Sequence, residues 1–244
     1  MAAIEINNLR KTYKDVVAVD DLSLSIEEGE LFSLLGVNGA GKTTTIKMLS
    51  TLLAPTSGDA LILGKSLVKE SREIKGLLDL SMQETAVARK LTVEENIEFY
   101  AALNGMKKEE ILRVKKELYD SFGLGAVTKK RAATLSGGWQ RKLSIALALV
   151  TRPKILFLDE PTLGLDVLAR RELWRMIESL KGKMTVILTT HYMEEAEALS
   201  DRIGIMNEGK LLFVGSKDEL YRISGKANVE EAFVEIVSGG KKYA

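Results

Sequence analysis

The chain has 244 residues, of which 45% are hydrophobic and 28% charged. These proportions are ordinary for a folded globular protein and exclude a disordered chain. The 35 Lys and Arg residues nearly balance the 34 Asp and Glu residues, so the net charge is +1, which argues against a dedicated nucleic-acid binder. The chain has no Cys and one His, which excludes disulfides, a cysteine nucleophile and a His-rich metal site.

No segment of the sequence predicts a membrane span. The longest uncharged stretches, 31–41 and 48–58, have eleven residues each, whereas a spanning helix needs about 20 apolar residues. Residues 1–8 contain no basic region followed by an apolar run, so no secretory signal is predicted. We therefore expect an intracellular chain that serves a membrane, if at all, by docking to another chain.

The first third of the chain reads mainly as strands. Apolar residues alternate with serines over 22–26, which is typical of a strand, and 31–35 is an apolar run of buried-strand length. A glycine-rich loop, 36–41, follows directly. Apolar residues then recur at helical spacing over 46–53, and the Pro-Thr-Ser-Gly sequence at 55–58 is predicted to end this helix.

The middle of the chain, 84–152, is rich in Glu, Lys, Ala and Leu. It predicts amphipathic helices over 94–103 and 107–122 and a third helix over 138–150. We therefore expect a helical block inserted into a β-containing core. The apolar face predicted for the second helix consists of Ile111, Leu112, Leu118, Tyr119 and Phe122.

Strands and helices alternate after Pro153, which predicts a mainly parallel sheet. Asp166 is predicted to cap the N-terminus of a helix that runs to about Leu180. The other predicted elements are strands over 155–158, 185–190, 202–206 and 211–214 and a helix over 194–199.

The C-terminal region predicts one more amphipathic helix. Asn228 is followed three residues later by Glu231, as in a capping box. Apolar residues follow at helical spacing from Val229 to Val237. We favour packing of this helix against its own domain over a surface for a partner.

Residues 36–43, Gly-Val-Asn-Gly-Ala-Gly-Lys-Thr, match the G-x(4)-G-K-[ST] pattern of a phosphate-binding loop. Glycines let successive N–H groups curl around a phosphate, and the N-terminus of the following helix adds partial positive charge. Lys42 is expected to reach the β- and γ-phosphates, and the Thr43 hydroxyl to bind Mg²⁺. Asp159, at the end of an apolar strand, stands where an acid organises Mg²⁺, and Glu160 beside it could orient or deprotonate water.

The segment Leu-Ser-Gly-Gly-Trp-Gln-Arg at 135–141 lies 18 residues before Asp159. With these motifs the sequence resembles the ATP-binding-cassette (ABC) ATPases over about residues 4–215. The signature of that family is Leu-Ser-Gly-Gly-Gln, closely followed by Asp-Glu-Pro. The resemblance implies an α/β fold: a P-loop NTPase core with a mainly parallel sheet, an antiparallel N-terminal β-subdomain and an inserted helical subdomain. The expected divisions are 1–83 with 153–215 for the core, 84–152 for the helical subdomain with the signature, and 216–244 for a short helical tail.

The resemblance also implies roles for single residues. Gln83 is the Q-loop glutamine, which reaches Mg²⁺ or the attacking water, and His191 is the switch histidine that contacts the γ-phosphate. Asp159 is the Walker B acid and Glu160 the catalytic carboxylate. The implied nucleotide contacts are Tyr13, stacked on adenine, and the phosphate loop Gly36, Val37, Asn38, Gly39, Ala40, Gly41, Lys42, Thr43 and Thr44. The implied contacts across a dimer are Ser136, Gly137 and Gly138, on the γ-phosphate of ATP held by a second copy, and Asp166 at the dimer seam.

Three positions depart from the family pattern. Val37 replaces a common Pro, which is a mild change in a tolerant loop. Trp139 replaces the Gln of the signature and puts in doubt any polar contact made by that fifth side chain. Leu163 stands where a Ser is frequent, which weakens a polar contact across the dimer.

The sequence is most similar to cassettes of the ABC-2 exporter group, because of residues 139–141, the segment 190–197 and the short C-terminal helix. That resemblance implies two copies, expected to be identical, that sandwich two Mg·ATP. It also implies docking of integral membrane subunits near residues 83–94, at the cytoplasmic face of the membrane, with no nucleic-acid partner. Two alternatives stay open: a soluble ABC ATPase acting on ribosomes, nucleic acid or an assembly complex, and a non-catalytic nucleotide-binding regulator.

Overall fold

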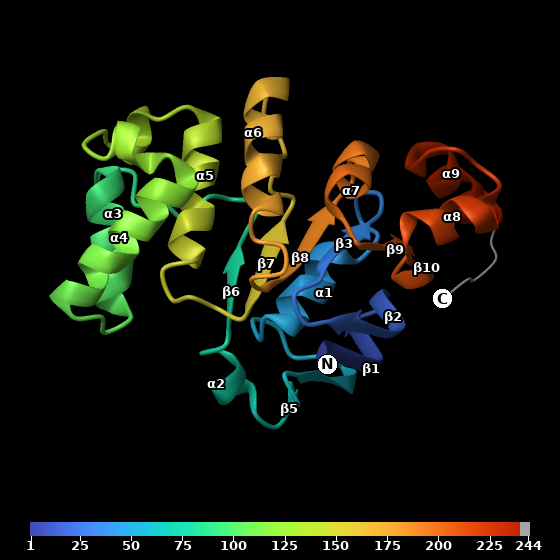
Figure 1. The fold of residues 1–244 in the computed structure, drawn as a ribbon. Helices are drawn as coiled ribbons and strands as arrows, with labels where there is room; N and C mark the ends of the chain where they lie inside the picture. The colour runs from blue at the N-terminus through green and yellow to red at the C-terminus, as the bar shows by residue number, and fades with distance from the viewer. Residues whose placement is uncertain (240–244) are drawn as a thin grey trace.

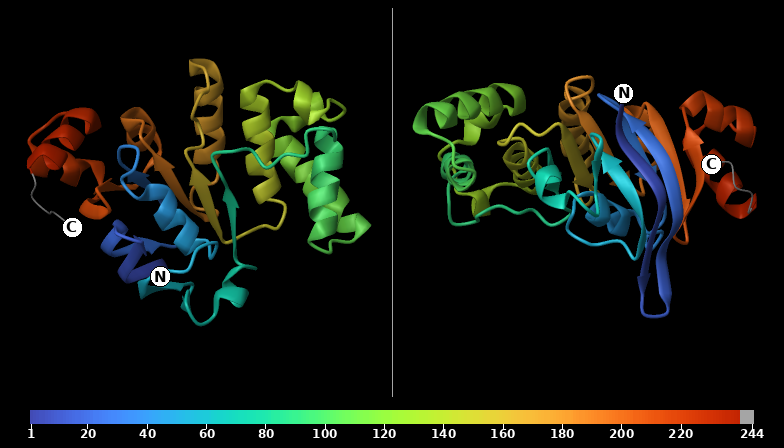
Figure 2. Two further views of the ribbon diagram at one scale, coloured as in Figure 1. Left: turned by 180° about the vertical axis from the view of Figure 1, so that it is seen from behind. Right: turned by 90° about the horizontal axis from the view of Figure 1, so that it is seen from below.

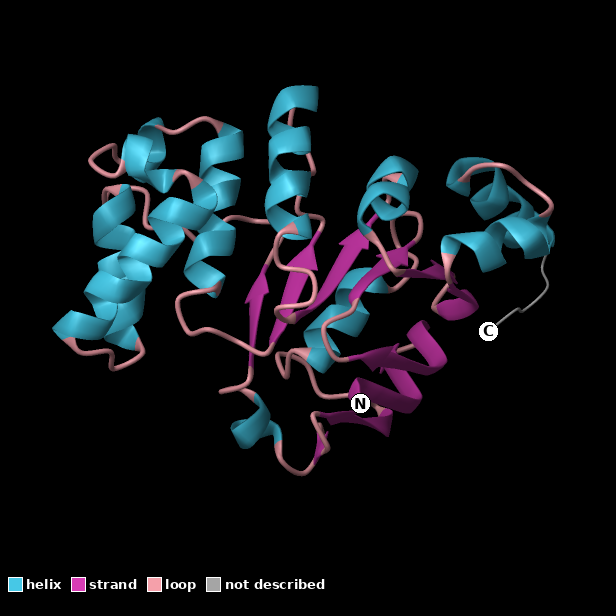
Figure 3. Cartoon of the chain, in the orientation of Figure 1, coloured by secondary structure: helices cyan, strands magenta, loops and turns pink. Residues whose placement is uncertain are grey.

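The computed structural model describes residues 1–239, in which two β-sheets are flanked by helices (Figures 1 and 3). Neighbouring strands of the larger sheet run parallel except at one edge, where the last strand is antiparallel. The mainly parallel sheet expected from the sequence is therefore confirmed. In order across the sheet, its strands are β10 (Lys210–Gly215), β9 (Arg202–Asn207), β3 (Leu31–Leu35), β8 (Thr185–Thr190), β7 (Ile155–Asp159) and β6 (Leu78–Ser81).

The smaller sheet is antiparallel and built from the N-terminal part of the chain. The side chains of Leu22 and Ile26 are buried, which explains the alternation seen in the sequence. The predicted antiparallel β-subdomain is confirmed. Its strands, in order, are β2 (Val16–Glu27), β1 (Ala2–Tyr13), β4 (Ser57–Ile62) and β5 (Lys65–Ser66).

The helices lie beyond both edges of the larger sheet and on its faces. A helical group, α3 to α5, lies beyond the β6 edge, and α8 and α9 lie beyond the β10 edge (Figure 2). The helices are α1 (Lys42–Leu49), α2 (Ser71–Ile74), α3 (Val93–Leu103), α4 (Lys108–Phe122), α5 (Gly137–Ala148), α6 (Val167–Glu178), α7 (Met193–Leu199), α8 (Lys217–Ser224) and α9 (Val229–Gly239).

The larger sheet is buried on both faces, as the alternation of side chains in β7 shows. Ile155 and Phe157 pack in a core with α1 and the antiparallel sheet. Leu156 and Leu158 point to the opposite face and pack in a core with α5 and α6. A strand covered on both faces needs a continuous apolar run, which is how residues 155–158 read in the sequence.

Two helix predictions were wrong in detail. Helix α1 ends at Leu49 rather than near residues 55–58, because Thr51 adopts a left-handed backbone with φ +63° and Leu52 is 61% exposed. In α4, Leu112 is 56% exposed and Val114 is buried in its place. Val114 is in phase with the buried positions one and two turns further on, whereas Leu112 is not.

Helix α9 packs against its own domain, as predicted. The side chain of Asn228 accepts a hydrogen bond from the N–H of Glu231 at 2.9 Å and so caps the helix. Its buried face shares a core with β9 and β10: Val229, Ala232, Phe233 and Ile236 pack with Ile203, Ile205 and Phe213. Residues 240–244 of the predicted tail lie outside the described residues. Within residues 1–239, no helix is both long and apolar enough to cross a membrane.

Candidate active site

The phosphate loop connects β3 to α1 and is held in place by two glycines. A Cβ on Gly36 would lie 2.3 Å from the carbonyl oxygen of Met206, and a Cβ on Gly41 would lie 2.4 Å from that of Ala18. Gly41 also has φ +104°, a conformation that strains other residues. Only glycine therefore lets the loop approach β2 and β9 this closely and turn into α1.

A cavity of about 370 Å³ opens beside this loop, at the carboxyl ends of the parallel strands, where α/β proteins bind ligands. The structure gathers here residues from five segments of the chain. The cavity is lined by Ala18, Asn38, Gly39, Ala40, Gly41, Lys42, Thr43, Thr44, Gln83, Glu160, Leu163 and His191.

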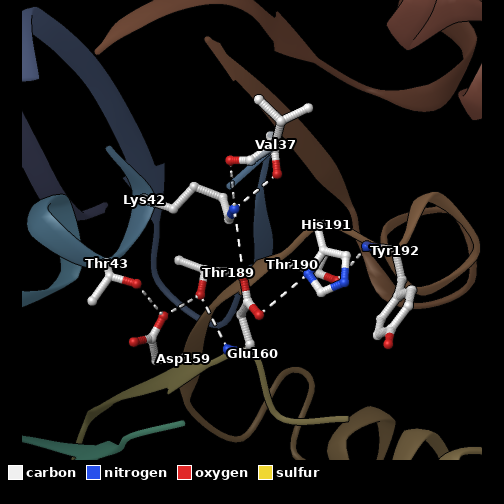
Figure 4. Close-up of polar contacts among 10 residues, drawn as sticks. Val37, Lys42, Thr43, Asp159, Glu160, Thr189, Thr190, His191 and Tyr192 are labelled. Carbon is white, nitrogen blue, oxygen red and sulfur yellow. Dashed lines mark hydrogen bonds and ion pairs between the residues drawn. The ribbon is translucent and has the colours of Figure 1, made fainter. Parts of the chain in front are cut away.

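Lys42 is a buried cation at the floor of the cavity, and its side chain is 4% exposed. Its Nζ donates hydrogen bonds to the carbonyl oxygens of Gly36 at 2.7 Å and Val37 at 3.1 Å, and lies 3.5 Å from Oε1 of Glu160 (Figure 4). Burial lowers the pKa of Lys42, while the carboxylate of Glu160 acts in the opposite direction. Within residues 1–239 its one ion-pair partner, Glu160, is shared with His191. A buried ammonium in this position suits an incoming phosphate.

Asp159 lies at the end of β7 and accepts two hydrogen bonds from hydroxyl groups. Thr43 Oγ1 donates to its Oδ1 at 3.0 Å, and Thr189 Oγ1 donates to the same atom at 2.6 Å (Figure 4). Thr189 in turn accepts a hydrogen bond from the N–H of Glu160 at 3.1 Å. The adjoining carboxylate and hydroxyl of Asp159 and Thr43 are the hard oxygen donors that Mg²⁺ prefers, so these residues fit the predicted metal.

Thr189 was not among the residues predicted for the site. It lies directly opposite Asp159 in the parallel pairing of β7 and β8. The signal that would have found it is a hydroxyl residue at the carboxyl end of the neighbouring strand, one position before the segment 190–197.

Glu160 connects Lys42 to His191. Its backbone has φ +47°, a left-handed conformation that is rare for residues other than glycine and is found at functional sites. Oε2 of Glu160 lies 3.2 Å from Nδ1 of His191. That nitrogen is buried, and among residues 1–239 it meets Glu160 in a close contact that lacks hydrogen-bond geometry. The imidazole itself lines the cavity, where it can meet a ligand.

The signature residues do not line the cavity. Ser136 lies at the N-terminal cap of α5, with Gly137 and Gly138 in its first turn. Trp139 follows, with Nζ of Lys142 4.5 Å from the centroid of its ring. The structure therefore separates the signature from the phosphate loop of the same chain.

Tyr13 and Asp166 also lie outside the cavity lining. Tyr13 ends β1 and is 46% exposed. The side chain of Asp166 caps α6, as predicted, by accepting hydrogen bonds from the N–H groups of Leu168 and Ala169 at 2.9 Å each. Any contact of Asp166 with another chain would have to share this carboxylate with the cap.

These features define a nucleotide-binding site of the P-loop NTPase class. Strand β3 of the parallel sheet runs through a glycine-rich loop into α1, and a buried Lys and two acids lie at the strand ends. A family model described as "ABC transporter" matches residues 19–163. The chain belongs to this family, as one of its ATP-binding ATPase cassettes. The family resemblance and the fold class expected from the sequence are confirmed.

Three relatives illustrate the similarity. The doxorubicin resistance ATP-binding protein DrrA of Mycobacterium tuberculosis is 40% identical over 96% of this chain and 70% of its own length. The probable multidrug ABC transporter ATP-binding protein YbhF of Escherichia coli is 39% identical over 96% of this chain. The human phospholipid-transporting ATPase ABCA3 is 43% identical over 88% of it. The chain spans 41% of YbhF and 13% of ABCA3.

Solved structures agree with this assignment. An ATP-binding subunit of an ABC transporter superposes with a TM-score of 0.84 at 29% identity, over 96% of this chain and 99% of the other. The cbiO1 protein of Clostridium perfringens, part of the ABC transporter complex cbiONQ, gives a TM-score of 0.83 at 25% identity, over 91% of each chain.

Proposed function

We propose that two copies of this chain sandwich two Mg·ATP, and that hydrolysis opens the dimer and drives export of a substrate through separate membrane subunits. One observation carries the proposal. The cavity holds Lys42, Glu160 and His191 of one chain, while Ser136 to Gly138 lie outside it. A site completed by the signature of a second copy accounts for this separation.

Within each chain, residues in and beside the cavity have separate roles in phosphoryl transfer. Lys42 neutralises charge on the β- and γ-phosphates. Thr43 and Asp159 hold Mg²⁺, which supplies further positive charge to the phosphate oxygens when it is bound. Glu160 orients or deprotonates the attacking water. His191, which lines the cavity beside Glu160, donates to the γ-phosphate.

The remaining predicted contacts involve the nucleotide base and the second copy. Ser136 supplies a hydroxyl, and Gly137 and Gly138 supply bare N–H groups at the N-terminus of α5, all toward the γ-phosphate held by the partner. Tyr13 stacks on adenine from the exposed end of β1, and Asp166 lies at the dimer seam. Gln83 reaches the metal or the attacking water. A change in the nucleotide site is transmitted through Gln83 to the helical block, residues 84–152.

The role of Thr43 predicts a specific effect on metal binding. Thr43→Val removes the hydroxyl beside Asp159 at nearly constant shape, and we expect the Mg²⁺ concentration needed for tight ATP binding to rise by about 10-fold. Thr43→Ser keeps the hydroxyl and should bind as the parent does. A Mg²⁺ titration monitored with a fluorescent ATP analogue measures both. Equal Mg²⁺ requirements for Thr43→Val and the parent would refute the assignment.

Docking of membrane subunits near residues 83–94 is supported by the shape of this region. Gln83 and Glu84 are exposed between β6 and α3. A second cavity of about 370 Å³ lies nearby, with Leu52, Asp79 and Met106 in its lining. Export is supported by the similarity to DrrA, a doxorubicin resistance protein, and to YbhF, a probable multidrug transporter protein. We therefore assign the chain to the cytoplasmic face of the membrane as a peripheral subunit.

A pull-down from native membranes tests this assignment. Tagged Glu160→Gln, held with Mg·ATP, is expected to bring down a polytopic membrane protein in stoichiometric yield, and the same capture without ATP serves as the control. Recovery of ribosomes, nucleic acid or only soluble proteins would cancel the transport assignment and favour a soluble ABC ATPase.

A further inference from the structure

Arg141 is a buried cation outside the nucleotide cavity, and its side chain is 5% exposed. It projects from α5 to the backbone that follows β6. Its Nη1 donates to the carbonyl oxygen of Met82 at 2.6 Å, and its Nη2 donates to the carbonyl oxygen of Gln83 at 2.5 Å. Arg is rarely buried unless its charge is compensated. The placement therefore calls for an explanation beyond packing.

The electrostatic surroundings of Arg141 include two acids. Burial lowers the pKa of Arg141, and the carboxylates of Asp159 and Glu195 oppose this effect. An Arg guanidinium stays protonated in proteins, so this charge lies in the field of Asp159, the acid predicted to hold Mg²⁺. Both of its hydrogen bonds within residues 1–239, however, end on carbonyl oxygens of the Q-loop backbone rather than on a carboxylate.

The two ends of this contact belong to different nucleotide sites in the proposed dimer. Gln83 lines the cavity of its own chain. Arg141 lies on the helix that begins with Gly137 and Gly138, which face the ATP of the other copy in the proposed arrangement. The guanidinium therefore connects α5, which contacts the ATP of the other copy in the proposed dimer, to the Gln83 loop, which lines the ATP cavity of its own chain.

We propose that Arg141 is a positioning residue that fixes the backbone of Gln83 to the signature helix, so that engagement of one nucleotide site sets the position of Gln83 in the other. This inference rests on the proposed dimer function. The planar guanidinium makes two directed hydrogen bonds from one rigid group, which a Lys ammonium does not reproduce. Loss of these two hydrogen bonds frees the backbone of the exposed Gln83. A displacement of about 1 Å at a catalytic group can lower a rate by about 10²-fold.

The chain offers a matched control on the same helix and strand. Ser144, three residues after Arg141, has its Oγ 3.1 Å from Oγ of Ser81 at the end of β6, and both side chains are buried. Ser144→Ala removes this second polar contact between α5 and β6 and leaves Arg141 in place. It therefore separates a general loosening of the α5–β6 packing from the specific loss of the guanidinium.

The test measures kcat, KM and the Hill coefficient for ATP, with the melting temperature as a check on folding. In Arg141→Lys and Arg141→Met we expect kcat to fall about 10- to 100-fold, the Hill coefficient to approach 1, and ATP affinity to stay within about twofold, because Lys42 and Thr43 are untouched. Ser144→Ala should keep the parent values. Arg141→Lys retains the charge and the aliphatic stem, so it serves if Arg141→Met fails to fold.

A double-mutant cycle with Gln83→Ala identifies the route of the effect. If Arg141 acts through Gln83, Arg141→Lys should lower kcat little further in the Gln83→Ala background. An equally large decrease in that background, or an equal decrease in Ser144→Ala, would overturn the proposal. Failure of the proposed function looks different: Glu160→Gln would then keep the mass of a single chain in solution with Mg·ATP bound.

Discussion

Glu160→Gln is expected to lower kcat for ATP hydrolysis by about 10²- to 10⁴-fold, the usual contribution of a general base, while ATP still binds. The substitution keeps the size of the side chain but removes the carboxylate that would orient or deprotonate water. Lys42, Thr43 and the loop glycines remain, so the phosphate contacts are unchanged. The variant should therefore separate binding from hydrolysis.

Steady-state phosphate release measures this effect, and binding of a fluorescent ATP analogue measures the retained affinity. Glu178→Gln is the matched control, because Glu178 is an exposed acid at the C-terminal end of α6, outside the cavity lining. It should hydrolyse ATP as the parent does. Near-normal turnover by Glu160→Gln would show that the water is activated by another group.

Lys42→Ala is expected to weaken ATP binding, whereas Glu160→Gln retains it. The expected loss is about 2–4 kcal/mol, or roughly 30- to 1,000-fold in affinity. Among the described residues, Lys42 is the one lysine or arginine that lines the cavity, so its loss removes the charge-assisted donor that this lining offers the phosphates. The Ala side chain also removes the charge that lies 3.5 Å from Glu160. Repulsion between that carboxylate and the triphosphate would weaken binding further.

Equilibrium binding of a fluorescent ATP analogue, with and without Mg²⁺, measures the loss. Lys47→Ala is a useful control because Lys47 lies on the same helix, in its last turn, and outside the cavity lining. Its affinity for ATP should match that of the parent. If Lys42→Ala bound ATP with unchanged affinity, the assignment of residues 36–44 as the phosphate loop would be wrong.

The part of the site that was predictable from the sequence depends on local geometry. A glycine-rich loop between a buried strand and a helix fixes its own shape, so the positions of Lys42 and Thr43 follow from residues 31–49 alone. The ends of two strands could also be predicted from the sequence, because Ile155–Asp159 and Thr185–Thr190 are short apolar runs that end in polar residues. Parallel strands then bring those ends to one edge of the sheet.

The contacts that the sequence did not predict are set by packing between distant elements. The hydrogen bond of Thr189 to Asp159 depends on the register of two strands, which no local pattern specifies. Arg141 was visible in the signature segment, but its carbonyl partners lie 58 and 59 residues earlier in the chain. Leu112 was misplaced because a few apolar residues in one window allow more than one helical phase, and only tertiary contacts select one.

A complete ATP site is proposed to require two copies of the chain, and the mass of Glu160→Gln in solution tests for this dimer. Light scattering in Mg²⁺ without nucleotide should give the 26.9 kDa of a single chain. Saturating Mg·ATP should double that mass, and Lys42→Ala combined with Glu160→Gln should abolish the doubling. A species that stays at the mass of one chain while ATP is demonstrably bound would rule out the proposed dimer.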